Sequence, residues 1–128
     1  MKFVGRGASG YPFVMDSSPR VGGEDSAARP VEVFLSSLGG CTGMDVISIL
    51  RKMKTEPEGF HIEIEEERQA DYPKAFTALH LTYVVKGEVP EENLKKAIEL
   101  SLSKYCPIAN TLAGTVRISS SYRIESSS

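Results

Sequence analysis

One segment limits what this chain can fold into more than any other: an apolar run that starts at Pro30 and reaches about Met53. Proline suits the first turn of a helix, and Glu32 lies where a carboxylate complements the positive end of the helix dipole. Basic residues complement the opposite end of the dipole, and they follow as Arg51, Lys52 and Lys54. The run therefore predicts one long helix.

The apolar side chains of this helix would point in nearly every direction around its axis. They are Val31, Val33, Phe34, Leu35, Leu38, Met44, Val46, Ile47, Ile49, Leu50 and Met53. Such a helix has to be buried on most sides. Because a chain of 128 residues buries only about two-thirds of its unfolded surface, we expect a second copy of the chain to cover the rest. The sequence thus predicts a homodimer.

Alternating apolar and polar residues predict antiparallel strands before and after the long helix. A second helix fits Pro90 to about Tyr105, where Glu91 and Lys95 form a favourable pair four residues apart. The expected strands are Lys2–Val4, Tyr11–Asp16, Phe60–Glu65, Phe76–Lys86 and Val116–Ile124. The resulting order, β-β-α-β-β-α-β, describes an α+β fold, and we expect a single domain over residues 1–128.

Charge and hydropathy exclude several classes of function. The net charge is −2, and the basic residues are scattered along the chain, so we expect no nucleic-acid partner. The first residues carry no apolar run typical of a signal peptide, and no uninterrupted apolar run is long enough for a membrane span. We therefore expect a cytoplasmic protein without a membrane partner. In that reducing compartment two cysteines are either buried thiols or a working redox pair.

Cys41 lies inside the long helix, with glycines at positions 39, 40 and 43. Glycine in a helix interior costs roughly 0.5–1 kcal/mol relative to alanine, so something must approach this backbone closely. That neighbour could be a crossing helix, a partner's helix or a ligand. Removal of side chains around a thiol also opens access to it. A small core cysteine and a reactive cysteine remain equally open interpretations here.

Cys106 is followed directly by Pro107, which favours a new helical turn that ends near Gly114. Cys106 would then lie at a helix N-terminus, where the dipole lowers the pKa of a thiol. The alternative is that Cys106 only ends the preceding helix and packs inward. A metal site is not expected, because His61 and His80 are the only histidines and both lie in strand patterns.

Two segments resemble the OsmC/Ohr superfamily, and most of all its YhfA-type branch. Gly22 and Gly23, followed by residues 28–41 (ARPVEVFLSSLGGC), resemble the Gly-rich loop and the proline-led helix that carries the peroxide-reacting cysteine in that family. Residues 104–108 (KYCPI) resemble the second cysteine segment. The spacing of the two cysteines and the order of strands and helices also agree with the family.

This resemblance implies an OsmC-like α+β fold with two central helices in an intertwined homodimer. It also implies a thiol-dependent peroxidase that reduces hydroperoxides, organic ones in particular, in defence against oxidative stress. Cys41 would attack the peroxide, and Cys106 would then form a disulfide with it. No bound cofactor is implied. The reductant would be an external dithiol, and a lipoylated protein is one possibility.

Three further residues are candidates to support the reaction. The family stabilises its thiolate with an arginine from the N-terminal hairpin, and Arg6 matches that setting. In the family, a glutamate directly after the proline holds the arginine. Here Glu32 stands one residue later, and this position favours a role in which its carboxylate only complements the helix dipole. Asp45 shares a helix face with Cys41 and would raise the pKa of that thiol unless a basic residue such as Arg6 pairs with it.

Two other functions remain open from the sequence. The dimer could bind an apolar or thiol-reactive small molecule without turnover, or the cysteines could be inert core residues of a structural dimer. Consumption of hydroperoxide separates the enzyme from both.

Overall fold

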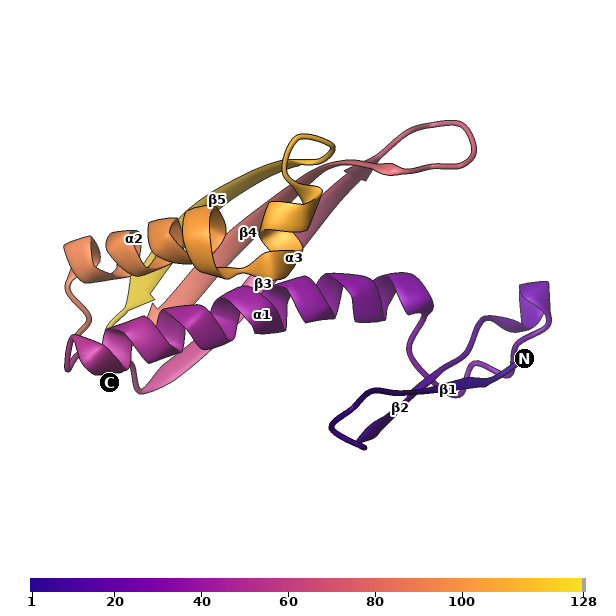
Figure 1. The fold of residues 1–128 in the computed structure, drawn as a ribbon, viewed down its shortest axis with the longest axis horizontal. Coiled ribbons are helices and arrows are strands. Elements are labelled where there is room, and N and C mark those ends of the chain that lie inside the picture. The colour runs from indigo at the N-terminus through magenta and orange to yellow at the C-terminus, as the bar shows by residue number, and fades with distance from the viewer. Residues whose placement is uncertain (128) are drawn as a thin grey trace. The chain divides into compact units, whose positions relative to one another are not determined.

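The computed structural model describes residues 1–127 (Figure 1), and Ser128, the last residue of the expected domain, lies outside them. The expected order of strands and helices is confirmed, including the helical turn that starts at Pro107, and one short helix is added before the long helix. In chain order the elements are β1 (Phe3–Arg6), β2 (Pro12–Met15), η1 (Pro19–Val21), α1 (Pro30–Lys52), β3 (Gly59–Arg68), β4 (Phe76–Lys86), α2 (Glu91–Leu100), η2 (Ser101–Tyr105), α3 (Pro107–Leu112) and β5 (Arg117–Glu125). Residues 1–37 form one compact unit, and the residues from 38 onward form another.

The first unit holds a β-hairpin, in which β1 and β2 pair antiparallel, followed by a closely packed loop. The buried carboxylate of Asp16 accepts hydrogen bonds from the amides of Ser17, Glu24 and Ser26 and from the Ser26 hydroxyl. The Ser26 hydroxyl and the Ser17 amide are the main reasons why the pKa of Asp16 is strongly lowered. Gly23 is required in this loop, because a Cβ there would lie 2.0 Å from the Ser17 carbonyl oxygen. These hydrogen bonds and this close backbone contact therefore hold the loop before α1 in one conformation.

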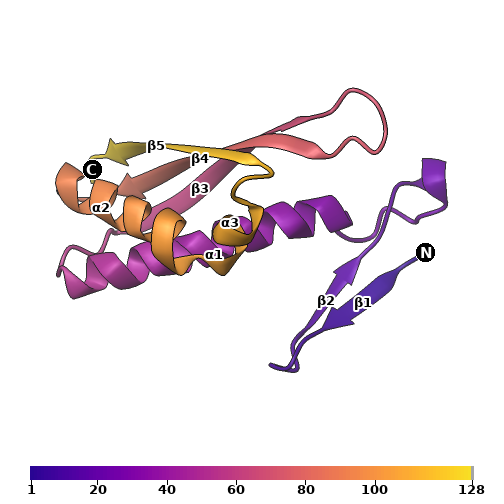
Figure 2. The ribbon, with the colours of Figure 1, turned by 45° about the horizontal axis from the view of Figure 1, so that its top comes forward.

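The second unit is built on a three-stranded sheet in the order β3-β4-β5 (Figure 2). β3 and β4 form a long antiparallel hairpin, as expected, but β5 runs parallel to β4. The expectation of antiparallel pairing was therefore wrong for the last strand. The chain between β4 and β5 passes through α2, η2 and α3, and a crossover that contains helices can return a strand in the same direction.

The second helix is regular only as far as Leu100, and the next turn is π-helical. In this turn the amide of Cys106 donates to the carbonyl oxygen of Ser101 at 2.8 Å. Pro107 has no amide hydrogen and cannot continue the ladder, so a new helix, α3, starts there. The expected helix from Pro90 to Tyr105 thus ends in a distorted turn directly before the second cysteine.

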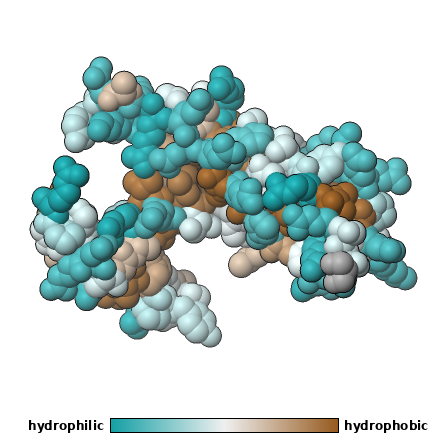
Figure 3. All heavy atoms as spheres, turned by 180° about the vertical axis from the view of Figure 1, so that it is seen from behind, coloured by the Kyte–Doolittle hydropathy of each residue, from teal (hydrophilic) through white to brown (hydrophobic). Residues whose placement is uncertain are grey.

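α1 buries a single stripe within one chain, and not most of its circumference. The buried residues are spaced four apart: Leu38, Thr42, Val46 and Leu50. By length and mean hydropathy, 1.6 over its most apolar window, α1 could also cross a membrane, a test that core helices of other proteins pass as well. Hydrophobic residues, coloured brown, are exposed on the face that Figure 3 shows. Large exposed apolar residues in the described chain include Phe3, Val4, Phe13, Val14 and Met44.

Candidate functional site

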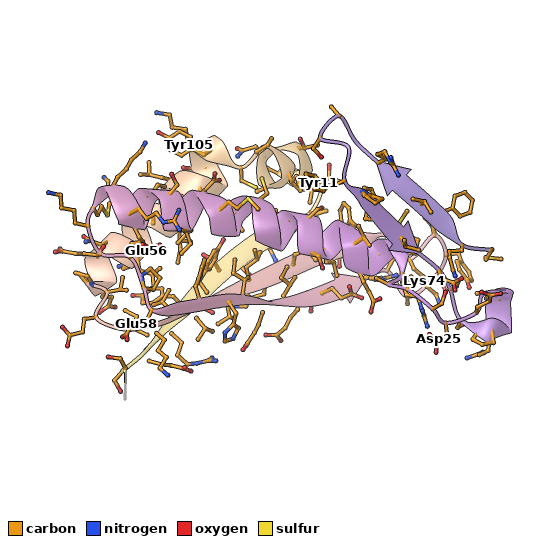
Figure 4. The ribbon with its side chains drawn as sticks, turned by 90° about the horizontal axis from the view of Figure 1, so that it is seen from below. Tyr11, Asp25, Glu56, Glu58, Lys74 and Tyr105 are labelled. Carbon is orange, nitrogen blue, oxygen red and sulfur yellow. The ribbon has the colours of Figure 1, made fainter. Side chains whose placement is uncertain are left out.

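The structure brings the two cysteines together, although they are remote in the sequence. Cys41 lies in the middle of α1 and is half-buried, whereas Cys106 is fully buried between η2 and α3. Both are free thiols, and Cys41 is close enough to raise the pKa of Cys106. Tyr105, the residue before Cys106, is exposed on η2 (Figure 4). Cys41 is thus a solvent-accessible thiol next to Cys106, a thiol without solvent contact.

Cys106 lies at the N-cap of α3, as the sequence predicted, but its pKa moves in the opposite direction to the one expected. Burial is the largest influence and raises the pKa, and the neighbouring Cys41 adds to this. The amide of Ala109 donates to the Cys106 sulfur at 3.4 Å and lowers the pKa, but less than burial raises it. The expectation of a lowered pKa is thus wrong, because the helix terminus is buried.

The glycines beside Cys41 let α1 approach the sheet. A Cβ on Gly39 would lie 3.2 Å from the Ile64 side chain, and one on Gly43 would lie 3.3 Å from that of Ile62. Both isoleucines belong to β3, so the close neighbour of this backbone is a strand of the same chain. A Cβ on Gly40 would meet nothing within 4 Å among the described residues. Two of the three glycines are thus explained by packing on β3.

A chain of buried hydroxyl groups lies next to the cysteine pair. The Tyr83 hydroxyl is 2.8 Å from Thr42 Oγ1, which is 2.6 Å from Ser101 Oγ. Ser101 in turn donates to Asp45 Oδ2 at 2.9 Å. Burial, above all, raises the pKa of Tyr83 to about 12, so its phenol remains a hydrogen-bond donor at neutral pH. Thr42, Tyr83 and Ser101 each have an exposed fraction of 0%.

This network answers where Asp45 points. Its carboxylate accepts a hydrogen bond from the Ser101 hydroxyl, and among the described residues it forms no ion pair with a basic side chain. Sequence reasoning missed Thr42, Tyr83 and Ser101. Their one local signal is that Thr42 follows Cys41, while its partners are 41 and 59 residues away in the chain.

Arg6 and Glu32 both belong to the first unit. Arg6 ends β1, and its side chain is exposed and forms no ion pair with the residues that the structure describes. Glu32 accepts the amide of Arg29 at 2.8 Å, the back-bond of a helix-capping box. This is the helix-terminal role that the sequence favoured for Glu32. The supporting roles of Arg6, Glu32 and Asp45 in catalysis stay predictions.

The two histidines lie on strands, as predicted. His61 pairs with Glu63 on β3, and the ring nitrogens of His80 on β4 lie 2.7 Å and 2.9 Å from the hydroxyls of Ser119 and Ser121. His80 and Tyr83 alternate to opposite faces of β4. Within residues 1–127, no three His, Cys, Asp or Glu residues are grouped as metal ligands would be.

The fold and the paired thiols define a class of small α+β proteins in which a half-buried helix cysteine adjoins a buried one. A family model described as OsmC-like protein matches residues 23–121, and the chain belongs to this family. Protein YhfA of Escherichia coli strain K12 is 33% identical over 125 residues, which cover 97% of this chain and 90% of YhfA.

Solved structures share the fold. A hypothetical protein from Aquifex aeolicus VF5 is 24% identical with a TM-score of 0.78, and the match covers 100% of this chain and 97% of that protein. An organic hydroperoxide resistance protein OsmC from Legionella pneumophila is 17% identical with a TM-score of 0.65, covering 95% of this chain and 94% of that one. The resemblance to the OsmC/Ohr superfamily and its YhfA-type branch is thereby confirmed.

Proposed function

We propose that this protein is a thiol-dependent peroxidase that reduces organic hydroperoxides. The observation that carries the proposal is the half-buried thiol of Cys41 next to the buried thiol of Cys106. Membership of the OsmC-like family supports it, and so does the shared fold with a protein named for organic hydroperoxide resistance.

The reaction has two steps on the protein. The Cys41 thiolate attacks the distal oxygen of the hydroperoxide, the O–O bond breaks, and the alcohol leaves after it takes up a proton. Cys41 is then a sulfenic acid. The Cys106 sulfur attacks the Cys41 sulfur, an S–S bond forms, the S–O bond breaks and water leaves. An external dithiol, free or carried on a lipoylated protein, reduces the disulfide and returns both thiols.

The division of labour follows from burial. A peroxide has to reach the first sulfur from solvent, and Cys41 is the more accessible of the two thiols. Cys106 is sealed from solvent, and its raised pKa keeps it protonated until the sulfenic acid forms beside it. Arg6 remains our candidate for stabilising the Cys41 thiolate. Glu32 is the candidate to hold Arg6, and Asp45 acts in the second step, through its hydrogen bond with Ser101.

We further propose that the protein works as a cytoplasmic homodimer without a bound cofactor. Within one chain, α1 buries only one stripe, and large apolar side chains of the first unit are exposed. These include Phe3 at 69% and Val4 at 60% exposure. A second copy is the simplest cover for this much apolar surface.

The test is a hydroperoxide-consumption assay with a dithiol as reductant. We expect wild-type protein to consume a small organic hydroperoxide catalytically, Cys41→Ser to lose all activity, and Cys106→Ser to lose turnover but still react once. Ser103→Ala is a matched surface control, because the exposed Ser103 hydroxyl donates to a helix carbonyl oxygen, and it should retain full activity. Consumption no faster than that of free cysteine would refute the proposal and favour a small-molecule-binding dimer.

A further inference from the structure

The hydroxyl chain joins the immediate neighbours of both cysteines. Thr42 directly follows Cys41 on α1, and the Ser101 carbonyl oxygen accepts the amide of Cys106 at 2.8 Å. The two side chains meet at 2.6 Å, the shortest link in the chain of hydroxyls. A single hydrogen bond thus connects the backbone around one sulfur to the backbone around the other.

The direction of this chain is fixed at one end. An ionised carboxylate can only accept, so Asp45 makes Ser101 the donor. Ser101 Oγ must then accept from Thr42, and Thr42 must accept from Tyr83. No buried side-chain nitrogen or oxygen in the described chain lacks a partner. Each hydroxyl therefore donates to one neighbour and accepts from the other in a single order, which fixes both the length and the direction of the link.

We propose that Thr42 and Ser101 are positioning residues that set the approach of the Cys41 and Cys106 sulfurs for disulfide formation. The inference rests on the proposed function, because it concerns the second step of that reaction. In this step the Cys106 thiol displaces water from the Cys41 sulfenic acid, after a hydroperoxide has oxidised Cys41. A disulfide forms only over a narrow range of Cα and Cβ separations.

The geometry explains why a polar link suits this position. Apolar side chains of the same size would also hold α1 against the π-helical turn, but they allow small slides between the two elements. A hydrogen bond between fully buried hydroxyls tolerates only a few tenths of an ångström before it weakens. Thr42 is bonded to Cys41 through the backbone, and Ser101 is hydrogen-bonded to the Cys106 amide. The narrow range of this hydrogen bond therefore also limits the separation of the two sulfurs, which raises their effective concentration.

The first test measures the Cys41–Cys106 disulfide at equilibrium in glutathione redox buffers, with no peroxide present. Thr42→Val keeps the shape and removes the hydroxyl, so the disulfide equilibrium constant should fall about tenfold, which raises the reduction potential by about 30 mV. Thr42→Ser keeps the hydroxyl and should match the wild type. Thr82→Val is the matched control, because Thr82 bonds to Ser121 on the opposite face of β4 from Tyr83.

The second test separates the two steps in a single turnover. In Thr42→Val and in Ser101→Ala, Cys41 should be oxidised at the wild-type rate, while disulfide closure slows about tenfold and the sulfenic acid accumulates for trapping with dimedone. Circular dichroism at the assay temperature identifies which of these two variants is folded, and the result from either folded variant tests the proposal.

The outcomes distinguish this inference from the proposed function. A wild-type potential in Thr42→Val, or a defect in Thr42→Ser as large as that in Thr42→Val, would overturn the positioning role alone. A wild type that forms the disulfide in glutathione buffer but consumes no hydroperoxide would overturn the peroxidase and leave the positioning role standing. A wild type that forms no disulfide would overturn both.

Discussion

Thr42 and Tyr83 should be energetically coupled, because the hydroxyl chain has a direction. Thr42→Val removes the acceptor of the Tyr83 phenol and leaves a buried O–H group without a partner. Tyr83→Phe removes the first donor of the chain, and Thr42 can still donate to Ser101. The order of the donors therefore predicts that loss of the middle hydroxyl is worse than loss of the terminal one.

The magnitudes follow from what each variant leaves unpaired. Tyr83→Phe loses one buried hydrogen bond and should cost about 1 kcal/mol of unfolding free energy. Thr42→Val also leaves an unpaired phenol and should cost about 2.5 kcal/mol. In the double variant no donor is stranded, so the total should be about 2 kcal/mol, below the sum of the single changes by about 1.5 kcal/mol.

Urea unfolding of the four proteins in this cycle measures the coupling, with the midpoint and slope compared under reducing conditions. Thr82→Val serves as a control for removing a hydroxyl from the opposite face of the sheet. Costs that add within about 0.5 kcal/mol would refute the directional chain. So would a Tyr83→Phe variant less stable than Thr42→Val.

Three further outcomes follow from burial and close contacts. Burial raises the pKa of Cys106 above its ordinary 9.0, so the unfolded chain loses the proton of this thiol at a lower pH than the folded chain does. The contribution of Cys106 to the free energy of unfolding should therefore be complete below about pH 9 and decrease above it. Urea unfolding of Cys106→Ala should show a smaller decrease of this free energy above about pH 9 than the wild type. Gly43→Ala should fail to give the roughly 0.5–1 kcal/mol that alanine gains in an open helix, because Ile62 would have to move, and a thermal melt checks this. Gly23→Ala forces its loop away from the Ser17 carbonyl, so limited proteolysis should cut that loop faster than in the wild type.

Much of the architecture is predictable because the strong signals are local. The boundaries of β4 matched the alternating pattern at both ends, and α1 began at Pro30 as its dipole residues indicated. The parallel pairing of β5 could not be read from its own residues, since alternation is the same in both directions. The turn before Cys106 was expected as ordinary helix, because the single extra residue of a π turn leaves no periodic signature over so short a stretch.

The site was predictable only in part, for physical reasons. The two cysteines could be paired through their resemblance to a family, and both segments had unusual neighbours in glycine and proline. The pKa of Cys106 depends on burial that only tertiary packing creates, so the helix terminus alone gave the wrong direction. Tyr83 and Ser101 are ordinary in their own elements, and their hydrogen bonds to Thr42 arise only where α1, β4 and η2 pack together.

Thiol titration tests the paired cysteines most directly. Reduced protein is treated with one equivalent of a small organic hydroperoxide, and the free thiols of each chain are counted before and after under denaturing conditions. We predict a change from two thiols to none, since Cys41 and Cys106 would close one disulfide. Loss of a single thiol, or of neither, would contradict the account.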